Sequence, residues 1–257
     1  VGLATARLLQ DAGFAVTIYA RELPPDTTSN VAGAQWAPVS VADPARKAPD
    51  FDARFVQAAR FAHRYFQSFA GPRYGVWWRE NYLLTDAAEL TLPWDWQLIA
   101  DLLPLVELAP REHPFPQKHV RRFLTMHIEP AVYLAEVLAD FRLAGGLVVV
   151  REIPDRAAVL ALPEPLVVNC TGLGAGRLCG DPDVEPVKGQ LVVLAPQPEV
   201  DYITVGPRGL YMMPRRDGIL LGGTQDLGIT SLAPDPAATA RILAGHQALF
   251  GAWPGCP

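Results

Sequence analysis

The sequence predicts an α/β fold made of two interleaved parts, a helix-and-strand unit of the parallel type and an antiparallel sheet. Three observations support this prediction. The chain opens with a helical pattern followed by a short apolar strand, and a helix followed by two strands returns between residues 129 and 170. The last third of the chain reads as short strands separated by Gly and Pro turns.

The opening segment "VGLATARLLQDAG" predicts a helix over residues 2–12, because small and apolar residues recur at near-helical spacing and Gly13 suits the position after a helix end. The next segment, "FAVTIYA", is short, β-branched and almost wholly apolar. This is typical of a parallel strand that is buried on both faces.

Two further helices are predicted. Residues 50–70 carry an amphipathic stripe that ends before Gly71. The segment "EPAVYLAEVLADFRLAGG" has Pro130 at the first helical position and Gly145 at its end, and it leads into the predicted strands "LVVV" and "PLVVNC". Residues 93–116, rich in Pro and Trp, receive no assignment. The predicted strands of the antiparallel sheet lie in "KGQLVVL", "YITVG", "GLYMMPR" and "GILLGGT".

Composition excludes several classes of protein. The 257 residues are 50% hydrophobic and 19% charged, which is enough to bury a core, and the net charge of −5 argues against nucleic-acid binding. No apolar run approaches the ~18–20 residues that cross a bilayer, and no signal peptide is recognised. The three cysteines form no disulfide framework and the five histidines lack ligand spacing. We therefore expect a cytoplasmic protein without a metal site or membrane contact.

The spacing of Gly2 and Glu22 has two interpretations. In a dinucleotide fold, a glycine at the start of the first helix lets the pyrophosphate approach, and an acidic residue about 20 positions on binds the ribose. The alternative is an ordinary helix and strand with a solvated glutamate. Further along, "TGLGAGR" begins like a glycine fingerprint but has Arg177 at the third glycine position, so spacing alone favours a turn.

Taken together, several segments resemble the D-amino-acid oxidase family of flavoproteins. The segments are "VGLATA", "YARELPPDTTSNVAGAQWAP", "VVNCTGLGAG", "VKGQL" and "GLYMMPRRDGILLGGT". They stand in the family's order and extend over nearly the whole chain.

The resemblance implies a GR2-type Rossmann FAD-binding domain interleaved with an antiparallel-sheet α+β substrate domain. The expected FAD-binding domain is 1–45 and 118–187, with its first strand missing, and the expected substrate domain is 46–117 and 188–257. The implied reaction is oxidation of a D-amino acid by FAD to a 2-oxo acid and ammonia, with dioxygen reduced to hydrogen peroxide.

The resemblance also implies which residues contact the cofactor. They are Gly2, Arg21, Glu22, Thr28, Ser29, Gly33, Ala34, Gln35, Trp36, Ile153, Cys170, Thr171 and Gly172. The alignment of this segment with the family leaves open whether Arg21 or Glu22 contacts the ribose. The alternatives are purely structural roles: local hydrogen bonds in a turn for Thr28 and Ser29, core packing for Trp36, and a buried, small apolar side chain for Cys170.

Tyr211 is implied to face the substrate and to hydrogen-bond its carboxylate, the alternative being a tyrosine on the sheet surface. Arg215 and Arg216 are expected to pair with acids on the solvent face, and His127 is expected to be structural.

Compared with the family, the chain lacks the first two fingerprint glycines, the substrate-carboxylate arginine and a late glycine-rich segment, so we expect a fragment cut at both ends. Two alternatives stay open. One is a related amine oxidase acting on D-aspartate, glycine or a secondary amine, and the other is a non-catalytic fragment. Homodimerisation is also left open.

Overall fold

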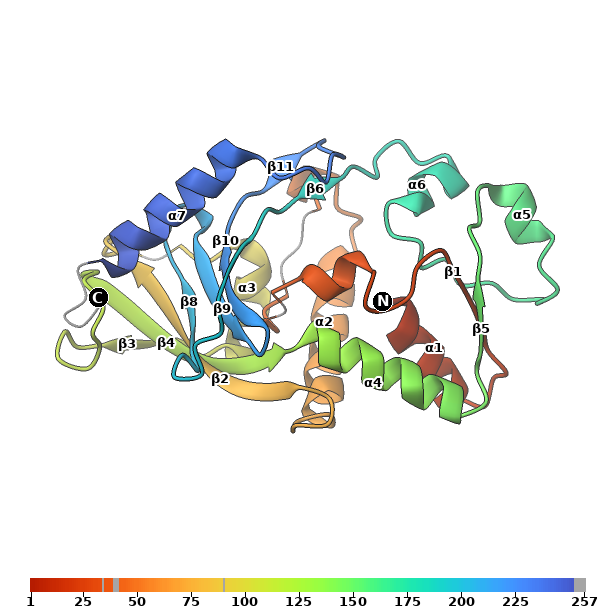
Figure 1. Ribbon diagram of the computed structural model, residues 1–257, viewed down its shortest axis with the longest axis horizontal. Coiled ribbons are helices and arrows are strands. Elements are labelled where there is room, and N and C mark those ends of the chain that lie inside the picture. The colour runs from red at the N-terminus through yellow and green to blue at the C-terminus, as the bar shows by residue number, and fades with distance from the viewer. Residues whose placement is uncertain (34, 39–41, 90, 252–257) are drawn as a thin grey trace. The chain divides into compact units, whose positions relative to one another are not determined.

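The computed structural model describes residues 1–33, 35–38, 42–89 and 91–251 (Figure 1). The chain divides into two compact units. Unit 1 comprises residues 1–32, 130–188 and 226–232, and unit 2 comprises residues 33–129, 189–225 and 233–257. Residues 33–45 and 118–129, which the resemblance places with the nucleotide half, therefore lie in the unit that contains the antiparallel sheet.

Unit 1 is built on the two-stranded parallel sheet of β1 (Thr17–Ala20) and β5 (Leu147–Val150), paired from Thr17↔Leu147 to Ala20↔Val150. Helix α1 (Gly2–Asp11) packs against α4 (Pro130–Leu143), and the 3-10 helix η1 (Thr28–Val31) also contacts α4. The remaining elements of this unit are α5 (Arg156–Leu160), α6 (Gly174–Cys179), β6 (Val187–Lys188) and β11 (Asp226–Leu227). The predicted helices and strands at 2–12, 14–20, 130–143 and 147–150 are thus confirmed.

The predicted strand "PLVVNC" is wrong. Residues 165–170 have no strand assignment, and Leu166, Val167 and Val168 are 66%, 44% and 50% exposed. Apolar, β-branched composition favours an extended chain, but a strand also requires a hydrogen-bonded neighbour. Among the described residues, β1 and β5 pair only with each other, and this segment pairs with neither.

Unit 2 contains a seven-stranded sheet in the order β3-β4-β2-β8-β9-β10-β7. Its strands are β2 (Val76–Thr85), β3 (Val106–Leu108), β4 (His119–Ile128), β7 (Val192–Leu194), β8 (Ile203–Val205), β9 (Tyr211–Arg215) and β10 (Gly218–Gly222). Its helices are η2 (Pro44–Arg46), α2 (Phe51–Gln67), α3 (Trp94–Leu98), η3 (Ala100–Leu102), η4 (Pro207–Gly209) and α7 (Pro236–Phe250). The helix predicted at 50–70 and the strands predicted in the last third are confirmed. All pairs are antiparallel except β2 with β8, so the sheet is mixed rather than purely antiparallel.

One face of this sheet is covered by α7 (Figure 1). Ile242 packs with Met212 and Leu221, and Leu249 packs with Leu84. This helix is not among those predicted from the sequence, although its start signal is present there. Asp235 caps it by accepting from the Ala237 N–H at 2.9 Å, and Pro236 follows directly.

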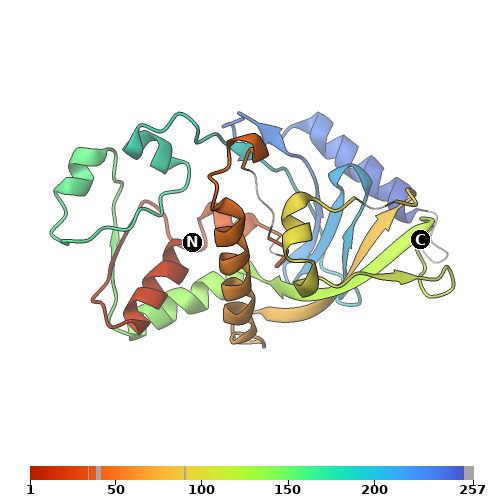
Figure 2. The same ribbon diagram turned by 180° about the vertical axis from the view of Figure 1, so that it is seen from behind.

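The opposite face of the sheet carries Tyr211. Side chains alternate along a strand, and residues paired across strands point to the same face. The pairs Tyr211↔Val205, Val205↔Leu83 and Asn81↔Phe123 therefore place one set of residues on this face: Tyr211, Met213, Arg215, Val205, Leu83, Asn81, Arg79, Phe123, Thr125 and His127. Figure 2, from behind, brings α2 and α3 to the front, and α3 contacts this face through Trp96 and Phe123, whose ring centroids are 5.6 Å apart.

Candidate active site

The start of α1 offers hydrogen-bond donors. The first bond inside the helix runs from the Thr5 N–H to the Val1 carbonyl at 3.0 Å, so the N–H groups of Gly2 and Leu3 precede it, and no described side chain caps the helix. Such groups, together with the helix dipole, favour an anionic ligand. A Cβ on Gly2 would lie 3.5 Å from the Cβ of Cys170, so the 170–172 turn lies beside this helix start.

Arg21 and Glu22 follow β1, and Ile153 follows β5. The strands are parallel and in register, so these residues leave from the same carboxyl edge of the small sheet. Arg21 Nε donates to Glu22 Oε1 at 3.1 Å, and both side chains are exposed. The Glu22 carboxylate therefore retains accessible oxygens.

Thr28 and Ser29 lie in η1, and both are exposed. Thr27 supplies the local hydrogen bond, donating from Oγ1 to Asn30 Oδ1 at 2.7 Å. Among the described residues the hydroxyls of Thr28 and Ser29 have no partner, so the local-turn alternative does not use them.

The 170–172 turn is exposed at Thr171 and half-buried at Cys170. The Thr171 hydroxyl donates to Asn169 Oδ1 at 2.7 Å, so it is already engaged within the turn. Gly172 has a φ of +57°, a conformation that favours glycine. Cys170 and Cys179 are free thiols.

The segment with Gly33, Gln35 and Trp36 lies in unit 2, where several hydrogen bonds hold it to β4. The Trp36 N–H donates to the Met126 carbonyl at 2.7 Å, and Thr125 Oγ1 donates to the Trp36 carbonyl at 2.6 Å. Ala34 lies outside the described residues. Trp36 packs in the core, as the alternative interpretation held, because it is 5% exposed, and its contact with the cofactor stays a prediction.

Gln35 and Gly33 are held to the face of the sheet that carries Tyr211. Gln35 Nε2 donates to Oδ1 of Asn81 at 2.5 Å, and Asn81 Nδ2 donates to the Arg79 carbonyl at 2.8 Å. A carbonyl can only accept, so the orientations of both side-chain amides are determined. A Cβ on Gly33 would lie 2.5 Å from Sδ of Met213, so Gly33 closely approaches β9.

Tyr211 is half-buried and lies over two glycines. Its cross-strand partner is Gly222, where an added Cβ would overlap the ring, and a Cβ on Gly223 would lie 2.9 Å from the ring's Cε1. Burial raises the pKa of the Tyr211 phenol, so the hydroxyl keeps its proton at neutral pH. This hydroxyl has no hydrogen-bond partner among the described residues.

Beyond Tyr211, the same face carries buried polar groups. His127 is fully buried and its Nε2 donates to the Gly33 carbonyl at 3.2 Å. Burial first, and then the nearby Arg79 cation, lower the pKa of His127 to about 4. Glu129, 5% exposed, pairs with Arg216 at 3.3 Å, and burial raises the pKa of its carboxyl.

Arg215 pairs with Asp217 through two contacts, Nε to Oδ1 at 2.8 Å and Nη2 to Oδ2 at 2.5 Å. The expectation that Arg215 and Arg216 pair with acids is confirmed. The expectation that these pairs lie in solvent is wrong for one side chain of each pair. The Arg215 side chain is 8% exposed, and Arg216 pairs with the buried Glu129.

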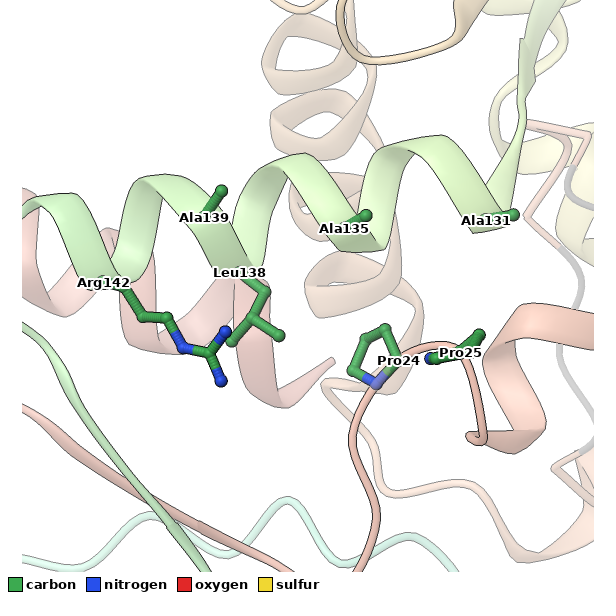
Figure 3. Close-up of a pocket in the computed structure, with 7 residues that line it drawn as sticks. All are labelled: Pro24, Pro25, Ala131, Ala135, Leu138, Ala139 and Arg142. Atoms are coloured by element: carbon green, nitrogen blue, oxygen red, sulfur yellow. The ribbon is translucent and has the colours of Figure 1, made fainter.

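A hollow of 280 Å³ lies in unit 1 between the 24–25 segment and α4 (Figure 3). It is lined by Pro24, Pro25, Ala131, Ala135, Leu138, Ala139 and Arg142. None of these is a residue that the sequence predicted to bind cofactor or substrate.

Three comparisons identify the class of protein. A family model described as FAD dependent oxidoreductase (DAO) matches residues 1–255. The D-amino-acid oxidase of Rubrobacter xylanophilus is 33% identical over 252 residues, covering 96% of this chain and 74% of the relative. Human D-aspartate oxidase is 30% identical over 255 residues, covering 97% and 73%. The solved structure of glycine oxidase from Geobacillus kaustophilus matches with a TM-score of 0.68 at 16% identity, covering 97% of this chain and 75% of that one.

The fold is that of an FAD-dependent oxidoreductase, and the chain belongs to the DAO family. FAD is therefore the cofactor, and the predicted family and α/β fold class are confirmed. No described helix combines the length and the apolar character that a bilayer crossing needs.

The donors in unit 1 fit FAD. The start of α1 offers N–H groups to a pyrophosphate, and Gly2 adds no side chain there. The hydroxyls of Thr28 and Ser29 are further donors, and the Glu22 carboxylate is an acceptor suited to a ribose. In the described part of the chain no group of three or more metal-type ligands occurs, and the absence of a metal stays a prediction.

Sequence reasoning did not single out Asn81 or His246, although both contact elements of this site. Asn81 stands in an otherwise apolar strand, "NYLLT", and such a polar residue can signal a buried hydrogen bond. His246 lies in α7, which was not predicted from the sequence. Recognising the start of α7 at Asp235 and Pro236 would have placed this histidine on a helix.

Proposed function

We propose that this protein oxidises D-amino acids to 2-oxo acids and ammonia, with dioxygen reduced to hydrogen peroxide. The observation that carries the proposal is the 33% identity, over 96% of the chain, to a relative named D-amino-acid oxidase. The protonated Tyr211 hydroxyl, which no described residue engages, supports it, because a substrate carboxylate needs such a donor.

In this proposal, the start of α1 with Gly2, the Thr28 and Ser29 hydroxyls and the Glu22 carboxylate hold FAD. When bound, FAD supplies the two-electron acceptor for the substrate Cα–H. Backbone at Gly33 and Gln35 would contact the isoalloxazine ring, and the hydrogen bonds of this segment to β4 hold that backbone in place. Residues 33–129 and 189–257, apart from 226–232, would then carry the substrate half.

Tyr211 orients the substrate by donating its hydroxyl proton to the carboxylate in a charge-assisted hydrogen bond. The glycines beneath the ring leave it room, and its burial keeps water from competing for the carboxylate. An anchored carboxylate restricts which enantiomer can present its Cα–H, which is the basis of D-specificity.

No protein base is assigned. The buried imidazoles of His127 and His246 each use Nε2–H to donate to a backbone carbonyl, at 3.2 and 2.8 Å. Each therefore holds backbone in place, and the substrate amine enters neutral. This is the chemistry expected if the Cα hydrogen leaves as hydride.

The test is to load the full-length protein with FAD and to measure hydrogen peroxide and 2-oxo acid with paired D- and L-amino acids. We expect stoichiometric formation of both products from D-alanine and no turnover of L-alanine. Turnover of L-amino acids or glycine alone would refute the proposal.

D-Aspartate is a second candidate substrate. The 30% identity to human D-aspartate oxidase supports it, and Arg79 and Arg215 lie on the same face of the sheet as Tyr211. The ratio of kcat/KM for D-aspartate to that for D-alanine decides between them.

We propose a cytoplasmic setting, with which the free thiols of Cys170 and Cys179 agree. Whether the protein forms a homodimer is tested by light scattering.

A further inference from the structure

His246 is a buried histidine that the proposed reaction does not use. It lies on α7 and is 4% exposed. Its Nε2 donates to the carbonyl oxygen of Gly222 at 2.8 Å, while Nδ1 is buried without a partner among the described residues. The proton on Nε2 is therefore committed to the backbone of β10.

Gly222 also supports Tyr211. It is the cross-strand partner of Tyr211, and the phenol ring occupies the space that a Cβ on Gly222 would fill. The ladder between β10 and β7 ends at Leu221↔Val192, one residue before Gly222. The end of β10 is thus held on one side by β9, and the hydrogen bond from His246 adds a contact from α7.

The two contacts act on opposite faces of the sheet. Helix α7 packs on the face of Met212, Ile219 and Leu221, through Ile242. Tyr211 lies on the other face, against Met213 and Ile203. The hydrogen bond to Gly222 therefore links α7 to the strand backbone on which the Tyr211 ring rests.

We infer that His246 is a positioning residue for substrate binding: by holding the Gly222 carbonyl, it sets the place of the Tyr211 hydroxyl. This inference rests on the proposed role of Tyr211 as the carboxylate donor. Because His246 acts through Gly222, its loss should weaken carboxylate capture and leave both FAD binding and the chemical step unchanged.

The experiment compares His246→Leu and His246→Gln in the FAD-loaded full-length protein, each with Tyr211 and with Tyr211→Phe. Leucine cannot donate, whereas the glutamine amide retains an N–H donor. Four quantities are measured: KM for D-alanine, kcat for D-alanine, the dissociation constant of propionate from the flavin absorbance change, and the dissociation constant of FAD.

For His246→Leu we expect KM and the propionate dissociation constant to rise about tenfold, as for the loss of one neutral hydrogen bond. The kcat and FAD affinity should stay within about twofold, and His246→Gln should recover most of the loss. In the Tyr211→Phe background, His246→Leu should change KM and the propionate dissociation constant hardly at all, because the hydroxyl that His246 positions is already absent.

Equal effects of His246→Leu with and without the Tyr211 hydroxyl would overturn the inference, as would an unchanged propionate dissociation constant. If His246→Leu does not fold, His246→Asn, whose shorter amide does not reach the Gly222 oxygen, takes its place. Failure of the proposed function is distinguishable, because Tyr211→Phe itself would then leave propionate and D-alanine binding unchanged.

Discussion

The buried imidazole of His127 should make the stability of this protein depend on pH. His127 is 0% exposed, its Nε2 donates to the Gly33 carbonyl, and its pKa is lowered to about 4, mainly by burial and then by Arg79. In the unfolded chain its pKa returns to about 6.5. Between these values the unfolded state binds more protons, so folding stability rises with pH.

The contribution of His127 is fully present above pH 6.5 and is lost as the pH falls towards 4. Each unit of pKa shift corresponds to about 1.4 kcal/mol, so the full difference is about 3 kcal/mol. Lowering the pH from 7.5 to 5.0 should remove about 2 kcal/mol through this one group. In His127→Gln, which keeps an amide donor for Gly33 but does not titrate, that loss should vanish.

The assay is urea unfolding at both pH values with saturating FAD, followed by far-ultraviolet circular dichroism. The loss of stability between the two pH values is compared for parent and His127→Gln, so that all other titrating groups cancel. His63→Gln is the comparison: burial also lowers the pKa of that half-buried imidazole, so its substitution should reduce the loss, but by less than His127→Gln does. Equal losses in parent and His127→Gln would refute the assignment of a buried neutral imidazole.

Three further predictions concern the cofactor and substrate residues. Tyr211→Phe should weaken substrate capture by about 1–3 kcal/mol with a normal flavin spectrum, and unchanged D-alanine kinetics would place Tyr211 outside the site. Glu22→Ala should weaken FAD binding by about 1.5–3 kcal/mol in a titration of apoprotein, with Arg21→Ala as the control for register. Gly33→Ala should destabilise unit 2 by about 1–3 kcal/mol, because the new methyl would meet Sδ of Met213 at 2.5 Å. Met213→Ala removes the clashing sulfur, so in that background Gly33→Ala should cost almost nothing further in thermal unfolding, and an equal cost in both backgrounds would contradict this account.

The sequence by itself determined the elements whose pattern is local. Periodicity and a terminal Pro or Gly specify α1, α2 and α4, because helical hydrogen bonds join residues four apart. The apolar β-branched runs of β1 and β5 likewise identify strands wherever a partner exists. The family, and with it FAD, followed from short segments whose residues are close in sequence.

Residues 165–170 show where local pattern was insufficient. Their composition is that of a buried strand, yet strand formation depends on a hydrogen-bonded neighbour elsewhere in the chain. The long strand β4 was also missed. Its start carries the charged residues Arg121 and Arg122 and its end is wholly buried, so it lacks the alternation of a half-buried strand.

Only the tertiary structure decided which residues share the face of the sheet that carries Tyr211. Gln35 and Asn81 are 46 positions apart, and their pairing depends on strand order and register, which sequence spacing does not encode. The same holds for His246 and Gly222, which meet because α7 packs across β10. Local sequence determined the chemistry that each side chain can perform, and long-range packing determined which of these side chains lie together.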